Sequence, residues 1–192
     1  MILDEYLIYL NESIQLNLID VKLFGFLVDL DQVKQYSKDH RILLNRGSIV
    51  ALKKAERDLP EGHKFLIKYG YRSYEEQEKI VKDTEKELKK SHPNNWEELL
   101  NTYTGGYKDL NEKNISYMNH RSGNAVDLTI VFNGKELDLG NVKLDKRDSL
   151  DYYEKNNQNT IIRDNRRLLK SVMTKHSFVP YPLEWWHWGF SK

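Results

Sequence analysis

The sequence predicts an α+β fold, a single domain in which helices flank a central, mostly antiparallel sheet. Runs such as KFLIKYGYR carry apolar residues at every second position, as strands do. Runs such as TIIRDNRRLLKSVMTKH carry them every three or four positions, as helices do. Both kinds are interspersed along 192 residues, with no repeat and no linker between them. We therefore expect one domain over residues 1–192, with a core large enough to need no disulfides.

The N-terminal half alternates strands and helices. Short apolar runs before residue 30 indicate one or two strands, interrupted at Gly25. A helix follows Ser48 and ends at Pro60, which cannot continue it. The next run predicts a half-buried strand whose inner face carries alternate residues: Phe65, Ile67, Tyr69 and Tyr71.

Two helices are expected after this strand. Ser73 and Glu76 form a capping box, in which each side chain satisfies a free backbone amide, and they predict a charged helix over residues 74–90. The stretch 95–100 indicates a short helix, which the glycines at 105–106 break.

The C-terminal half predicts two strands and a helix. AVDLTIVF, residues 125–132, is strongly strand-like, and the Asn-Gly pair after it is the best hairpin-turn signal in the chain. Residues 138–158 are polar and irregular, which indicates a long loop. A helix over 160–176 and a final strand over 178–190 complete the chain.

The composition excludes several kinds of partner. With 30 Lys and Arg against 29 Asp and Glu, the net charge is +1, so we expect no nucleic-acid partner. The absence of a signal peptide and of a run long enough to span a membrane predicts a cytoplasmic protein that binds no membrane. A small molecule or peptide is the expected partner, and no pattern indicates an oligomeric state. Without cysteine, any metal ion must be bound by His, Asp or Glu.

A histidine and an aspartate flank a glycine in NHRSGNAVDLTIV. His120 and Asp127 are seven residues apart, so one flat strand would point them to opposite faces, but Gly123 permits a turn between them. Asp127 shares its face of the strand with the small residues Ala125 and Thr129, while the other face is apolar. A carboxylate buried there needs a cation beside it, either a metal ion or an arginine.

The segment LEWWHWGF surrounds His187 with three tryptophans and places Glu184 three residues before it. His120, Asp127 and His187 form a suitable ligand set for one catalytic Zn²⁺ per chain, with a fourth position left for water. Glu184 is then the expected general base, and the tryptophans would exclude bulk water from the site. Arg72, between a strand and a capped helix, is expected to stabilise an oxyanion, since arginine keeps its charge.

Each of these signals also has an ordinary structural explanation. A histidine among tryptophans is more often a core residue, E-x-x-H is common by chance, and an arginine alone would satisfy Asp127. The surroundings of the other histidines, which are polar or lie at helix ends, favour a structural role for His40, His63, His92 and His176. Taken jointly, in this order and with a strand at Asp127, the residues favour a metal site.

Two motifs resemble those of the zinc D,D-peptidases, and most of all those of the D-alanyl-D-alanine dipeptidases. The segment from His120 to Asp127 is similar to H-x-x-G-x-A-x-D, and that from Glu184 to His187 is similar to E-x-x-H. Y-R before a helix, D-L-T in a strand and N-R-R-x-L in a later helix follow the family's order. The resemblance covers the chain from about Tyr71 onwards and implies a hedgehog/DD-peptidase-like fold.

By this resemblance, His120, Asp127 and His187 bind zinc, Glu184 is the base, and Arg72 stabilises the transition state. These assignments agree with those drawn above from residue type and position alone.

The resemblance also implies substrate contacts. Asp145, with Asp138 as the fallback, matches the acidic residue that binds the free ammonium group of the dipeptide. The family has a serine where this chain has Met118, which offers no useful hydrogen bond, and Asn119 is the candidate to compensate. Tyr71, Asn119 and Asp145 are thus the expected substrate-binding residues.

The implied function is zinc-dependent hydrolysis of D-alanyl-D-alanine, a cell-wall (peptidoglycan) precursor, by a water that the metal activates and Glu184 deprotonates. Two alternatives stay open. One is a D,D-carboxypeptidase or endopeptidase acting on longer peptidoglycan peptides, which needs an open groove. The other is a catalytically inactive zinc-binding module, against which the presence of both Glu184 and Arg72 argues.

Overall fold

A computed structural model describes residues 17–36, 40–105, 119–156 and 159–191. The fold is built on a mixed sheet. The strand order is β2 (Leu27–Val28), β4 (His63–Tyr69), β5 (Ala125–Phe132), β8 (His187–Phe190) and β7 (Phe178–Pro180), and β6 (Lys135–Glu136) also pairs with β5. These pairs are antiparallel except for β2 with β4. A separate antiparallel pair joins β1 (Leu18–Asp20) to β3 (Leu43–Asn45).

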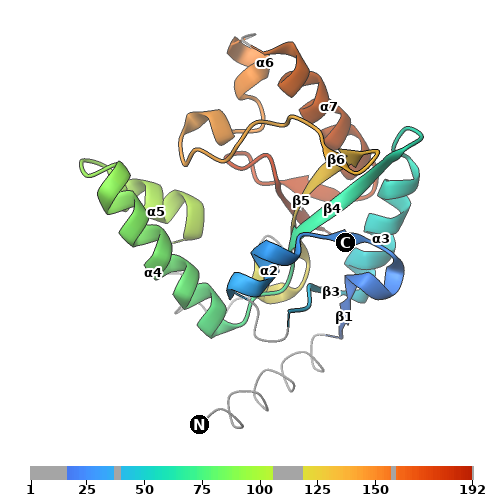
Figure 1. Ribbon diagram of the computed structural model, residues 1–192, viewed down its shortest axis with the longest axis horizontal. Coiled ribbons are helices and arrows are strands. Elements are labelled where there is room, and N and C mark those ends of the chain that lie inside the picture. The colour runs from blue at the N-terminus through green and yellow to red at the C-terminus, as the bar shows by residue number, and fades with distance from the viewer. Residues whose placement is uncertain (1–16, 37–39, 106–118, 157–158, 192) are drawn as a thin grey trace.

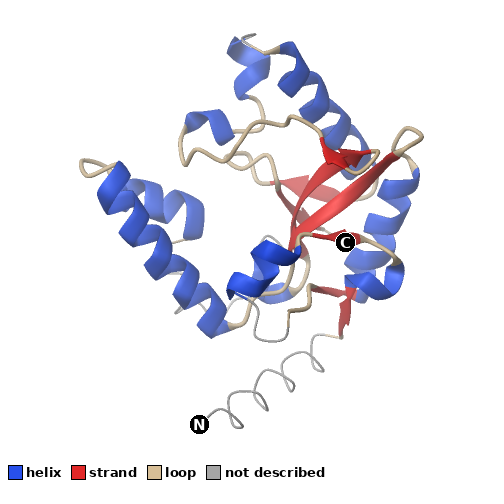
Figure 2. Cartoon of the chain, in the orientation of Figure 1, coloured by secondary structure: helices blue, strands red, loops and turns tan. Residues whose placement is uncertain are grey.

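Helices lie on both sides of this sheet (Figure 1). α3 (Arg46–Arg57) and α7 (Thr160–Lys175) contact each other on one side, whereas the pair α4 (Tyr74–Ser91) and α5 (Trp96–Thr104) stands apart at the left of the view. Figure 2 shows the strands enclosed between these two groups of helices. The predicted α+β class is confirmed. The shorter elements are α2 (Leu30–Tyr36), α6 (Tyr152–Asn156) and the 3-10 helices η1 (Val21–Phe24), η3 (His120–Ser122) and η4 (Lys146–Asp148).

The main core lies between the sheet and the helices α3 and α7. Val126, Leu128 and Ile130 of β5 belong to it and are fully buried. Their partners from the two helices include Ile49, Leu52, Leu169 and Met173. Because every residue from Ala125 to Val131 is buried, β5 is covered on both faces, and the second face carries Asp127.

Several local predictions are confirmed. Ser73 Oγ accepts a hydrogen bond from Glu76 N, and Glu76 Oε2 accepts one from Ser73 N, which completes the capping box at the start of α4. Asn133 and Gly134 both have positive φ, as a two-residue hairpin turn between β5 and β6 requires. The predicted inner face of β4 and the residues after it is buried: Phe65, Ile67, Tyr69 and Tyr71.

The predicted start of α3 is wrong by a few residues. The helix begins at Arg46 rather than after Ser48, because Asn45 Oδ1 accepts a hydrogen bond from Gly47 N and serves as the N-cap. Ser48 instead donates its hydroxyl hydrogen to Asn124 Oδ1 across the fold.

Two predictions in the C-terminal part are also wrong. The single strand expected over 178–190 is two strands, β7 and β8, because Glu184 N bonds Tyr181 O in a turn between them. The stretch 138–158, expected to be an irregular loop, contains η4 and α6. Asp145 caps η4, and its side chain forms a capping box with Asp148.

Arg166 of α7 fixes the loop over residues 138–150 to the body of the fold. Its buried guanidinium donates hydrogen bonds to three carbonyl oxygens of this loop, those of Leu139, Arg147 and Ser149. The neighbouring Asn165 donates to Asp138 O at 2.9 Å. The N-R-R stretch of the sequence therefore holds the loop in place.

Residues 1–16, which contain part of the apolar N-terminal runs, lie outside the described residues, so one domain over 1–192 stays a prediction. Among the helices that the structure describes, none is both as long and as apolar as a membrane-spanning helix has to be.

We expect Leu169→Ala to lower the free energy of unfolding by about 2–5 kcal/mol, because truncating a core side chain leaves a cavity. Leu169 is fully buried, whereas Ile161 on the same helix is 63% exposed and provides the control. Ile161→Ala should cost less than about 0.5 kcal/mol. Urea unfolding measures both, and equal losses would contradict this placement of the core.

Candidate active site

Three neighbouring strands bring two of the predicted site residues to one face of the sheet. Tyr69 on β4 pairs with Asp127 on β5, and Asp127 pairs with His187 on β8. Residues directly opposite each other on neighbouring strands point to the same face. Asp127 and His187 therefore face the same side, which is opposite to the main core.

His120 reaches this side from η3, just before β5. Gly123 ends η3 with a φ of 70°, which favours glycine, and a side chain there would also meet Leu18, so the predicted turn is confirmed. His120 Nδ1 lies 2.6 Å from the carbonyl oxygen of Gly70 and donates its hydrogen to it. This bond leaves Nε2 facing Asp127.

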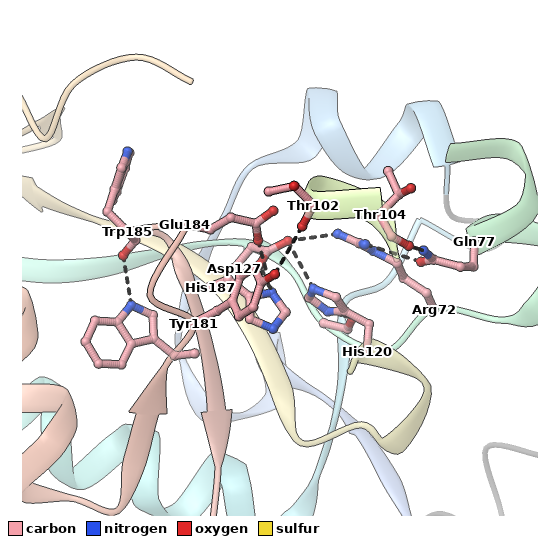
Figure 3. A network of polar contacts seen from close by, with 12 residues as sticks. Arg72, Gln77, Thr102, Thr104, His120, Asp127, Tyr181, Glu184, Trp185 and His187 are labelled. Carbon is pink, nitrogen blue, oxygen red and sulfur yellow. Dashed lines mark hydrogen bonds and ion pairs between the residues drawn. The ribbon is translucent and has the colours of Figure 1, made fainter. Parts of the chain in front are cut away.

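The three side chains form a compact candidate metal site (Figure 3). One ligand atom from each of His120, Asp127 and His187 lies within 4.8 Å of the others, and all three residues are buried. His120 Nε2 is 3.2 Å from Asp127 Oδ2 and makes no hydrogen bond within the described part of the chain. With the hydrogen on Nδ1, Nε2 presents a lone pair to a carboxylate oxygen, so two acceptors face each other. A cation between them would stabilise this arrangement, and the residues thus fit a metal ion.

The protonation states of the site also suit a metal. Burial, followed by the charge of Arg72, lowers the pKa of His120 to about 4, which keeps the neutral, metal-binding form at pH 7. Burial alone would raise the pKa of Asp127, but its contacts with His120 and His187 outweigh burial and hold that pKa well below its usual range. Asp127 is therefore ionised.

Arg72 is a cationic partner of Asp127, beside the candidate metal site. Its Nη2 donates to Asp127 Oδ2 at 2.8 Å, while Asp127 Oδ1 lies 3.0 Å from His187 Nδ1. The sequence left a metal ion and an arginine as alternatives for this carboxylate. The structure brings the arginine and the candidate metal ligands together at the same group.

Glu184 lies beside the candidate metal site, in the turn between β7 and β8. Its backbone N–H donates to Tyr181 O, and its carbonyl accepts from His187 N, so the turn fixes its position. Its Oε2 is 3.8 Å from His187 Nδ1 and the residue is 7% exposed. Burial raises the pKa of Glu184 to about 8, against the opposing effect of His187. Such surroundings suit a group that must accept a proton and return it.

The tryptophans around His187 divide between the core and the site. Trp185 and Trp188 are buried in the main core, and Trp188 Nε1 donates to Trp185 O at 3.1 Å. Trp186 meets Trp185 edge to face and lines the cavity above the site. The cluster thus anchors the segment that carries Glu184, besides shielding it.

A cavity of about 410 Å³ opens over these side chains. Pockets of about 300–1,000 Å³ are typical of small-molecule sites. The candidate ligands, Arg72 and Glu184 line it, together with parts of α4, the end of α5 and the β7–β8 turn. Residues of these walls include Gln77, Thr102, Thr104, Leu144, Tyr181 and Trp186.

The expected substrate-binding residues are not all at this cavity. Asn119 lines it, beside His120. Tyr71 is not among the lining residues, because its ring packs in a small cluster with Leu43 and Leu18. Met118, the departure from the family motif, lies outside the described residues.

Asp145 also lies off the cavity lining, although its neighbour Leu144 belongs to it. Its carboxylate binds Arg147 Nε at 2.9 Å and also contacts the Nη2 of that guanidinium. The fallback residue, Asp138, accepts a hydrogen bond from Gly140 N. An ammonium-binding role for either aspartate stays a prediction.

Sequence reasoning missed Tyr181, which comes three residues before Glu184. Its hydroxyl donates to Thr102 O at 3.2 Å, and its ring meets the His187 ring edge to face (Figure 3). It therefore links the site to the end of α5. Its place among apolar and proline residues gave no sign of this role.

Gln77 was missed as well, although the sequence held a signal. Its spacing puts it on the same stripe of α4 as the buried residues Val81 and Leu88, where a polar side chain is unexpected. Its Oε1 accepts from Arg72 Nη1 at 3.3 Å, and its Nε2 donates to Thr104 O at 3.1 Å.

Comparisons with known proteins match the chain to the family that its motifs resemble. A family model described as D-ala-D-ala dipeptidase matches residues 28–192. A curated D-alanyl-D-alanine dipeptidase from Enterococcus faecium is 33% identical over 75 residues, which are 38% of this chain and 37% of that protein. The chain thus aligns with little more than a third of this relative, while the family match extends over most of the chain.

We expect the protein to bind one Zn²⁺ per chain, and His120→Ala to lower the zinc affinity by at least about ten-fold, by removing an imidazole ligand. His92→Ala, outside the cluster, is the matched control and should bind as the wild type does. Calorimetric titration with zinc measures each variant after treatment with a chelator. Equal affinities for the two variants would rule out the cluster as the metal site.

Proposed function

We propose that this chain, which belongs to the D-ala-D-ala dipeptidase family, is a zinc-dependent peptidase that hydrolyses the D-alanyl-D-alanine dipeptide. One observation carries the proposal: three buried candidate ligands, a buried carboxyl group and an arginine meet in one cavity. Two imidazoles and one carboxylate suit a catalytic zinc ion, which needs a position left open for reactants. An inert structural metal would need neither Glu184 nor Arg72.

In the proposed reaction, different side chains bind the metal and transfer the proton. His120, Asp127 and His187 would hold the zinc ion, which supplies a Lewis acid that activates a water and polarises the peptide carbonyl. Glu184 accepts the proton of the attacking water and passes it to the leaving amine.

Arg72 stabilises the negative charge that develops on the carbonyl oxygen, since its guanidinium keeps its proton. Arg72 lines the cavity, which brings its guanidinium beside the expected position of the substrate. Asp127 holds the guanidinium at 2.8 Å.

The substrate is proposed to be a small peptide. The volume of the cavity, about 410 Å³, lies in the range typical of sites for small molecules. D-alanyl-D-alanine is a cell-wall precursor, and a cytoplasmic enzyme that cleaves it would recycle or remove it.

A second candidate function follows from the position of Asp145. Its carboxylate is paired with Arg147, away from the cavity, so the expected partner for a free ammonium group is engaged elsewhere. A D,D-carboxypeptidase acts on longer peptides whose D-alanyl-D-alanine end carries no free ammonium group. This enzyme would need no such partner.

We expect Glu184→Gln to lower kcat by about 10²–10⁴-fold, because an amide cannot accept the proton of the attacking water. Zinc binding, measured by titration, should stay close to that of the wild type. Glu61→Gln, at an exposed position, is the control. Wild-type turnover in zinc-loaded Glu184→Gln would contradict the proposed role.

A peptide panel tests the substrate. Zinc-loaded protein should release alanine from D-Ala-D-Ala but not from L-Ala-L-Ala, and a chelator should stop the reaction until zinc is restored. N-acetyl-D-Ala-D-Ala, which lacks the ammonium group, separates the two candidates. Faster cleavage of this peptide than of the free dipeptide would favour the carboxypeptidase, and cleavage of neither would contradict both.

A further inference from the structure

Gln77, in the first turn of α4, uses both ends of its amide group in the wall of the cavity. Its Oε1 accepts from Arg72 Nη1 at 3.3 Å, and its Nε2 donates to Thr104 O at 3.1 Å. The residue is 8% exposed. Thr104 is the last residue of α5, where helix carbonyls have no partner within the helix. The amide therefore joins the arginine of the site to the end of α5 (Figure 3).

The chemistry of the two neighbours fixes the orientation of this amide. A guanidinium only donates hydrogen bonds, and a carbonyl oxygen only accepts them. Oε1 must therefore face Arg72 and Nε2 must face Thr104, since the reverse orientation would lose both bonds. A methionine has the length of glutamine but can form neither bond, and a glutamate lacks the donor for Thr104.

Arg72 depends on such an anchor because its ion-pair partner is shared. Its guanidinium bonds Asp127, and its central carbon lies 4.3 Å from the centre of the Tyr69 ring. Asp127 also contacts His120 and His187. A cation held by these three residues would neutralise the carboxylate and weaken its attraction for Arg72. The bond from Gln77 does not depend on that charge.

We infer that Gln77 is a positioning residue, which holds the Arg72 guanidinium in place for the reaction and couples it to the α5 wall of the cavity. This inference rests on the proposed function, because that function assigns Arg72 a role in the reaction. An arginine side chain has several rotatable bonds, and a displacement of a charged group by about 1 Å can cost about a hundred-fold in rate. A neutral anchor that persists when the metal binds keeps the donor aligned.

A double-mutant cycle on the full chain tests this inference. The variants are Gln77→Met, Arg72→Met and the two combined, each loaded with zinc and assayed for kcat and KM on D-Ala-D-Ala. We expect Gln77→Met to lower kcat about ten-fold with less than a two-fold change in KM, because the loss falls on the transition state. In the Arg72→Met background the same change should alter kcat by less than about two-fold, since Gln77 then has no guanidinium to hold.

The control separates positioning from stability. Val81→Ala removes a fully buried side chain one turn further along the same stripe of α4, in the small core with Leu88 and Leu100. It should lower stability in urea unfolding yet show no coupling to Arg72→Met in kcat. Equal losses from Gln77→Met in both backgrounds, or a loss confined to KM, would overturn the inference.

The same variants keep the inference testable if the proposed function fails. Should zinc-loaded wild type cleave no D,D-peptide, the cycle is measured in the free energy of unfolding. Coupling between Gln77→Met and Arg72→Met would then support the anchoring of the guanidinium, and additive losses would overturn it. Activity in the wild type with additive kcat losses would overturn the inference and leave the proposed function standing.

Discussion

The buried carboxylate of Asp127 is the group on which the rest of the site depends. It lies within a central strand that is covered on both faces, where an unpaired charge would be costly. Cationic and hydrogen-bonding groups must therefore converge on it. Arg72, from the junction of β4 and α4, and His187, from β8, bond this carboxylate. His120, from η3, brings a candidate metal-binding nitrogen to 3.2 Å from it. Because these residues belong to different segments, the site can form only when β4, β5 and β8 are assembled.

The fold separates stability from chemistry across the sheet. One face of β5 joins α3 and α7 in the main core, and the other faces the cavity under α4 and α5. The α4–α5 pair has its own small core of Val81, Leu88 and Leu100, against which Leu144 packs. Hydrogen bonds from Gln77 and Tyr181 to the end of α5 then fix this pair relative to the site.

The sequence was most informative where chemistry and local pattern coincide. Asp127 and His187 could be picked out because each is a polar group in an apolar stretch, and Glu184 because it lies three residues before His187. Gly123 indicated the turn that brings His120 towards Asp127. The capping box and the Asn-Gly hairpin could be predicted because each depends on neighbouring residues alone.

The remainder depended on contacts between distant segments. Nothing local indicates that Arg72 bonds Asp127 across 55 positions, or that Tyr181 reaches Thr102 across 79. The direction of Asp145 is set by Arg147, two residues later, and by the cap of η4, which alignment to a motif does not reveal. The end of α5 contacts the site residues only through tertiary hydrogen bonds, which the local sequence does not indicate.

X-ray absorption at the zinc edge, on protein loaded with one equivalent of zinc, shows whether His120, Asp127 and His187 bind the metal. We predict two imidazole nitrogens at about 2.0–2.1 Å and a carboxylate oxygen at about 2.0–2.2 Å, with the spectrum altered in Asp127→Asn. A first shell without imidazole scattering, or the same spectrum for wild type and Asp127→Asn, would contradict it.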